Sequence, residues 1–195
     1  MSNQTDRFAG LSAQEKRALL AELLRKKAAE NTAEFPLSYG QKALVYLTRL
    51  DPDTPTYNTM FVIGIEAELN IDLLRDAFRE IIARHDTLRT SYGLQGKHFV
   101  QRVHAARDAD FEAFDASTWD RNDLESRLVA DAACPYDLEC DSVIRLRAYS
   151  RSRESHVLML GVHHITFDYW SYDIFAHELI QLYACKQKGV PSGLA

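Results

Sequence analysis

The sequence lacks the features that would mark a secreted or membrane-embedded protein. Its 195 residues include only three cysteines, an odd number with no metal-type pair, so neither a disulfide framework nor a zinc site is predicted. No apolar run approaches the roughly 20 residues of a membrane span. Residues 1–10 are polar and have no apolar core of a signal peptide. We therefore expect a chain that works in the reducing cytoplasm, without a membrane partner.

An excess of basic charge is also absent. The 23 Lys and Arg residues are outnumbered by 28 Asp and Glu residues, which gives a net charge of -5. Phosphate binding needs clustered Lys and Arg, so nucleic acid is not an expected partner. What the chain does have is 46% hydrophobic and 26% charged residues, the balance of an ordinary globular domain with a core.

The first 33 residues are predicted to be a polar tail followed by a linker or docking helix. Ser12 and Glu15 have the spacing of a capping box, and the helical pattern runs from Leu11 to about Ala29. Its apolar stripe, residues 19–24, is narrow, and its other faces are charged. A solvated helix and a helix that docks on a neighbour both remain open.

Residues 34–195 read as one α/β domain, with a mixed β-sheet flanked by helices and no internal repeat. Residues 30–37 are expected to be a linker, and residues 105–121 have too weak a pattern to assign. The expected helices are 38–50, 70–84, 122–134 and 169–188. The expected strands are 57–69, 143–150, 155–162 and a hairpin formed by 87–92 and 98–104, with its turn at 93–96.

The most informative segment is the end of the last predicted strand, where His163 and His164 are adjacent. Successive strand residues point to opposite faces, so one histidine can face a cavity while the other supports the backbone behind it. Asp168 stands at the start of the next helix, where it could be a plain N-cap. The histidines could equally be core residues with satisfied hydrogen bonds.

Two other kinds of site are disfavoured by the same segment. A metal site would need a third ligand at a familiar spacing, and the two histidines diverge. A serine hydrolase would need a Gly-x-Ser-x-Gly elbow, which the sequence does not contain.

His163-His164-Ile165-Thr166-Phe167-Asp168, followed by Trp170-Ser171, resembles the core motif of nonribosomal peptide synthetase condensation domains. Three other segments resemble motifs of this family in the right order. These segments are 35–41 (Ser-x-x-Gln), 84–92 (Arg-His-x-x-Leu-Arg-Thr) and 135–138 (Pro-Tyr-Asp-Leu). The resemblance covers about residues 11–195.

The resemblance implies one lobe of the two-lobed chloramphenicol acetyltransferase-like fold. In such a domain, phosphopantetheine arms of a donor and an acceptor carrier protein meet in a tunnel between the lobes, where an amine attacks a thioester and an amide forms. No cofactor is expected to bind directly. A complete domain of this family is more than twice as long as this chain. Residues 34–195 are therefore expected to be the N-terminal lobe, inactive without its C-terminal lobe.

By the same resemblance, His164 is the catalytic candidate, as a proton acceptor or as a group that orients the amine. His163 and Asp168 are expected to support it, with Asp168 ion-paired to Arg84 or, as second choice, Arg89. Such a buried pair would make Asp168→Ala damaging to folding.

The candidates to line the tunnel between the lobes are Tyr169, Trp170 and Ser171. No metal site is expected. Tyr169 replaces the usual Gly of the family, as in condensation domains at polyketide–peptide junctions, which suggests an acyl or polyketide donor.

Three alternatives share parts of this pattern. An epimerisation domain carries the same His-His-x-x-x-Asp motif, although Trp170-Ser171 favours condensation. A free-standing acyltransferase has the same fold, and a half-domain could bind carrier proteins without catalysis. The order of modules in the full-length protein separates epimerisation from condensation, and the length of the reading frame beyond Ala195 tests the half-domain.

Overall fold

The computed structural model describes residues 32–194. The helix expected over 11–29, with its Ser12 cap, lies outside the described residues, as does nearly all of the 1–33 segment.

The strands form two sheets where the sequence predicted one. In the first sheet, β1 (Ala33–Pro36), β4 (His98–Val103) and β3 (Thr90–Gln95) are antiparallel in the order β1-β4-β3. The second sheet is mixed and has the order β2-β7-β6-β5. Its strands are β2 (Asn58–Ile65), β7 (His156–His163), β6 (Ile144–Ser150) and β5 (Asp110–Asp115). Only β5 and β6 are parallel. The predicted fold class, a mixed sheet flanked by helices, is confirmed.

The helices begin and end within one residue of the predicted positions because their caps are encoded locally. They are α2 (Tyr39–Leu50), α3 (Ile71–Arg84), α4 (Arg121–Ala133) and α5 (Tyr169–Lys188), with a 3-10 turn, η2 (Asp86–Arg89), after α3. Ser38 and Gln41 form a capping box at α2, and the Asn70 side chain caps α3.

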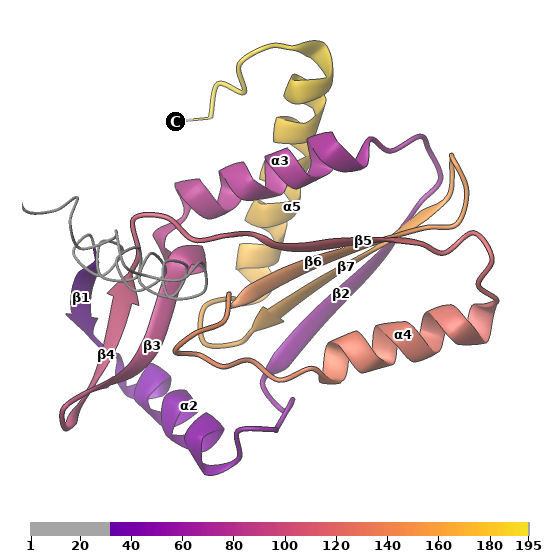
Figure 1. The fold of residues 1–195 in the computed structure, drawn as a ribbon. Coiled ribbons are helices and arrows are strands. Elements are labelled where there is room, and N and C mark those ends of the chain that lie inside the picture. Colours follow the sequence, from indigo (N-terminus) through magenta and orange to yellow (C-terminus); the bar gives the residue numbers. More distant parts are fainter. Residues whose placement is uncertain (1–31, 195) are drawn as a thin grey trace, which may run out of the picture.

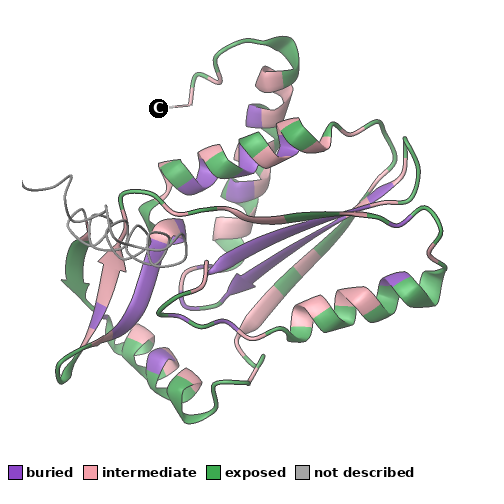
Figure 2. Cartoon of the chain, viewed as in Figure 1, coloured by how far each residue is buried: buried purple, intermediate pink, exposed green. Residues whose placement is uncertain are grey.

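Helices α3 and α5 cover one face of the four-stranded sheet and α4 covers the other (Figure 1). Side chains of β6 alternate between these faces: Ile144 and Leu146 pack into the core beneath α3 and α5, whereas Tyr149 packs with Leu124 of α4. The central strands β6 and β7 are almost entirely buried, while β2 at the edge is partly exposed (Figure 2). The end of β7 is therefore held by strands on both sides.

A second buried cluster connects the two sheets. Val45 of α2 and Tyr92 of β3 pack with Tyr136, Leu138 and Ile165. Because Ile165 belongs to the loop after β7, this cluster fixes that loop against the first sheet.

Two buried arginines lie on the α4 face of β6. Arg145 and Arg147 form ion pairs with Asp110 at 3.2 and 2.6 Å. Arg145 also donates to the carbonyls of Cys134 and Pro135. Its guanidinium lies 3.8 Å from the Tyr136 ring centre. The Pro135–Leu138 segment is thus fastened to the sheet next to the end of β7.

Candidate active site

The loop between β7 and α5 is closed by one bond within itself and tied to two other parts of the chain. The backbone N–H of His164 donates to the Tyr57 carbonyl, and that of Thr166 donates to the His163 carbonyl. The Thr166 hydroxyl donates to the Thr87 carbonyl at 2.9 Å. These bonds close the loop as a turn with little freedom to rearrange.

His163 faces the interior, and only 3% of the residue is exposed. Its Nδ1 accepts a hydrogen bond from the Ile165 N–H at 3.1 Å. Its ring packs edge-on against Tyr136, with the ring centres 5.9 Å apart. Burial, and secondarily the neighbouring His164, lowers the pKa of His163 from 6.5 to about 4. The neutral ring can therefore keep accepting the Ile165 bond at neutral pH.

This shift makes the fold acid-sensitive. The unfolded chain protonates His163 near pH 6.5 and the folded chain only near 4, so stability is complete above 6.5 and falls as the pH drops toward 4. We expect His163 to account for a loss of about 2 kcal/mol between pH 7 and 4.5.

The measurement is urea unfolding at the two pH values, with His163→Asn as the comparison, since its amide oxygen can accept the Ile165 bond but does not titrate. The variant should be less stable at pH 7 and lose less stability on acidification. An equal loss in both proteins would contradict the assignment.

His164 points the other way and is exposed, as the strand alternation predicts. Its Nδ1 lies 3.0 Å from the Phe167 carbonyl oxygen. A carbonyl only accepts, so Nδ1 carries the proton and Nε2 is left as an acceptor in the neutral ring. Within residues 32–194, no protein group is hydrogen-bonded to Nε2. The geometry presents one oriented basic nitrogen at the surface.

The predicted ion pair of Asp168 with Arg84 or Arg89 is wrong. Arg84 pairs with Glu178 at 3.3 Å, and Arg89 pairs with Asp86. Asp168 and Glu178 are ten residues apart on α5, about 15 Å along the helix axis. Arg84, at the end of α3, meets the middle of α5 where the two helices pack.

Asp168 instead caps α5. Its Oδ1 accepts from the Ser171 hydroxyl at 2.7 Å and from the Ser171 N–H at 2.8 Å, and these bonds lower the pKa of the Asp168 carboxyl. The simpler N-cap interpretation of this residue is confirmed.

We therefore expect Asp168→Ala to have a mild effect on folding, instead of stranding a buried charge. Loss of an exposed N-cap should lower the melting temperature by about 2–4 °C. Asp168→Asn should retain most of the stability, because its amide oxygen can still cap. Unfolding of the alanine variant at room temperature would contradict this role.

The first turn of α5 presents large aromatic side chains to solvent. Tyr169 is 71% and Trp170 75% exposed, whereas Ser171 lines a small cavity beside the loop. The structure thus brings the loop residues and these three side chains together, and leaves Arg84 and Arg89 in separate ion pairs.

Sequence reasoning missed the partners that hold the two histidines. The Phe167 carbonyl fixes the His164 ring, and Tyr136 and Tyr57 flank His163. Tyr136 does lie in a recognised motif segment, but only the fold shows that this segment packs against His163.

The described residues show neither a metal-binding cluster nor a membrane helix. Within 32–194, no group of three His, Cys, Asp or Glu side chains is arranged to hold a metal ion. No helix in that range combines the length and apolarity of a membrane span.

Curated relatives and a family model match most of the chain. The condensation domain model matches residues 31–194. Chondramide synthase of Chondromyces crocatus is 33% identical over 163 residues, which are 82% of this chain and 4% of that protein. Surfactin synthase subunit 2 of Bacillus subtilis (strain 168) is 33% identical over 166 residues, 85% of this chain and 4% of that protein. The chain therefore spans a small part of these synthetases.

Solved structures agree with the fold. The starter condensation domain of rhizomide synthetase has a TM-score of 0.78 at 19% identity, covering 84% of this chain and 40% of that one. The first condensation domain of the calcium-dependent antibiotic synthetase has a TM-score of 0.75 at 21% identity, covering 84% and 40%. The family inferred from the motifs is thereby confirmed: the chain belongs to the condensation-domain family of nonribosomal peptide synthetases, and it corresponds to an N-terminal portion of such a domain.

Proposed function

We propose that this chain is the N-terminal lobe of a condensation domain that joins a carrier-bound acyl or peptidyl thioester to a carrier-bound aminoacyl group. The observation that carries the proposal is the geometry of His164. Its ring is fixed through Nδ1 to the Phe167 carbonyl, at the exposed end of a buried strand, so Nε2 can accept a hydrogen bond from a substrate amine.

Amide formation does not require Nε2 of His164 to be a strong base. An α-amino group has a pKa of about 7.7–8.0, so a useful fraction is neutral near pH 7. The amine attacks the thioester carbonyl, the C–N bond forms, the C–S bond breaks, and the amine proton ends on the departing thiol. Nε2 of His164 either receives that proton in passing or orients the amine by accepting its N–H. In both roles the neutral tautomer set by Phe167 is the competent one.

His163 and Asp168 act through the loop in this proposal. His163 holds the Ile165 N–H from inside the fold, and Asp168 holds the first turn of α5. Neither reaches the substrate; both keep the His164 backbone in place.

One lobe alone cannot enclose a substrate tunnel. The chain covers about 40% of the solved condensation domains that it matches, and Tyr169 and Trp170 are exposed in the first turn of α5, directly after the loop that contains His164. We infer that a C-terminal lobe closes the tunnel, that donor and acceptor carrier proteins deliver substrates on phosphopantetheine arms, and that the isolated chain is inactive. Tyr169, in the family's glycine position, favours an acyl or polyketide donor.

The test is amide formation by the full-length synthetase with both carriers loaded, read by mass spectrometry of the carrier-bound product. We expect amide with the full-length protein and none with residues 1–195 alone. Epimerised donor without amide would indicate an epimerisation domain. Amide from free acyl thioesters and free amines would indicate a stand-alone acyltransferase, and carrier binding without any product would indicate a non-catalytic half-domain.

A further inference from the structure

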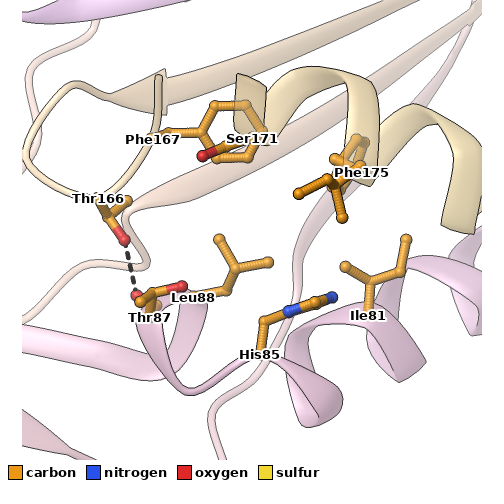
Figure 3. A pocket seen from close by; sticks show the side chains of 9 residues that line it. Ile81, His85, Thr87, Leu88, Thr166, Phe167, Ser171 and Phe175 are labelled. Atoms are coloured by element: carbon orange, nitrogen blue, oxygen red, sulfur yellow. Dashed lines mark hydrogen bonds between the residues drawn. The ribbon is translucent and has the colours of Figure 1, made fainter. Parts of the chain in front are cut away.

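A cavity of about 110 Å³ opens between the end of α3, the η2 turn and the first turns of α5 (Figure 3). Its floor is apolar and consists of Ile81, Leu88, Phe167 and Phe175, all of which are buried. Polar groups also line it, from His85, Thr87, Thr166 and Ser171, and the exposed Ile174 lies at its edge on α5.

The walls of this cavity are fixed before any ligand arrives. Phe167 and Phe175 pack edge-on with ring centres 6.1 Å apart, and Phe175 packs in the same way on Phe78. The bond from the Thr166 hydroxyl to the Thr87 carbonyl holds the loop against η2. His85 Nε2 lies 2.8 Å from Glu178 and is occupied there. A cavity with such walls can select a ligand by size.

The volume sets that size. A cavity of about 150 Å³ in another protein accommodates benzene, with six heavy atoms, so 110 Å³ corresponds to about four. The apolar floor offers no partner to a charged group. A propyl, butyl or isobutyl group satisfies both conditions.

The cavity is also adjacent to the candidate catalytic residue. Thr166 and Phe167, which line it, follow His164 by two and three residues, within about 11 Å even in extended chain. Phe167 contributes to both places: its carbonyl orients the His164 ring and its side chain forms part of the cavity floor. A substrate reacting at Nε2 can therefore extend a short chain into this space.

We propose that this cavity binds an aliphatic group of three to four carbons belonging to the substrate, and so selects substrate length. The inference rests on the proposed function, because it takes the ligand to be the donor acyl chain or the acceptor side chain. Each buried methylene should change the dissociation constant by about fourfold.

The experiment follows binding to the 195-residue chain with ¹³C-labelled Ile and Leu methyl groups by NMR. One arm titrates the butanoyl thioester of N-acetylcysteamine, which represents the donor; the other titrates leucinamide, which represents the acceptor. We expect saturable shifts at Ile81, Leu88 and Ile174 in at least one arm, and the responding arm identifies the source. The acetyl thioester, two methylenes shorter, should bind about 16-fold more weakly than the butanoyl thioester.

Two matched variants test the location. Ile174→Trp places a larger side chain against the cavity and should weaken binding at least tenfold. Ile180→Trp adds the same side chain on the same helix, at an exposed residue outside the cavity lining, and should leave the affinity unchanged. Absence of saturable shifts with both probes, or unchanged binding in Ile174→Trp, would overturn the proposal. Because binding is read without turnover, these outcomes are distinct from a failure of amide formation in the full-length synthetase.

Discussion

Replacing His164 with alanine in the full-length synthetase should lower the rate of amide formation by about 10²–10⁴-fold, the range of a positioned acid–base group. The alanine variant loses the imidazole nitrogen that the Phe167 carbonyl holds in a fixed orientation. The fold should be unaffected, because the His164 side chain is exposed and its one hydrogen bond is to the Phe167 carbonyl, which water can satisfy. The measurement is single-turnover product formation with both carriers preloaded.

His98→Ala is the matched control. His98 is also exposed and also at the end of a strand, but in the β3–β4 hairpin, and its loss should leave the rate within about twofold. His164→Gln separates the two chemical roles, since an amide oxygen can accept a hydrogen bond from the amine but cannot take a proton at neutral pH. Substantial activity in His164→Gln would favour orientation. A His164→Ala enzyme as fast as the wild type would remove His164 from the mechanism.

Much of the fold follows from local patterns in the sequence. Asn70 and Asp168 start their helices where capping chemistry predicts, and the divergence of His163 from His164 follows from strand geometry. The strands β1 and β5 were not predicted. All four residues of β1 are exposed, so no alternation of buried and exposed positions marks it. Within residues 32–194, β5 is an edge strand that pairs with β6 alone.

The electrostatic partners could not be predicted, because they depend on how distant elements pack. Arg84 and Asp168 are both in motif segments, and the resemblance to the family suggested a pair between them. Because α3 packs on α5, Arg84 forms its ion pair with Glu178, which also contacts His85. A sequence pattern identifies charged residues well, but the crossing of two helices decides which charges meet.

Asp110→Ala should be the most destabilising of the single substitutions considered, with a loss of about 3 kcal/mol or more in the free energy of unfolding. Asp110 pairs with both Arg145 and Arg147, whose side chains are only 8% and 9% exposed. Removing the shared carboxylate leaves two buried positive charges side by side. Their remaining acidic partners, Asp141 and Glu112, are more exposed and more distant, at 3.3 and 3.8 Å.

Glu112→Ala is the matched control on the same strand and the same side. Its carboxylate is 52% exposed and lies 3.8 Å from Arg147, so its loss should cost less than about 1 kcal/mol. Urea unfolding at pH 7 compares the two variants directly. Equal stability of Asp110→Ala and Glu112→Ala would mean that the buried arginines do not depend on Asp110.

Asp110→Ala should also alter the structure of the candidate active site. Arg145 holds the Cys134 and Pro135 carbonyls and lies against the Tyr136 ring, which packs on His163. In folded Asp110→Ala we therefore expect changed NMR signals of the His163 ring, while signals of His98 in the first sheet stay the same. Unchanged His163 signals in a destabilised variant would mean that Arg145 and Arg147 do not affect the loop between β7 and α5. A change would make Asp110, far from His164 in the sequence, part of what keeps the loop between β7 and α5 in position.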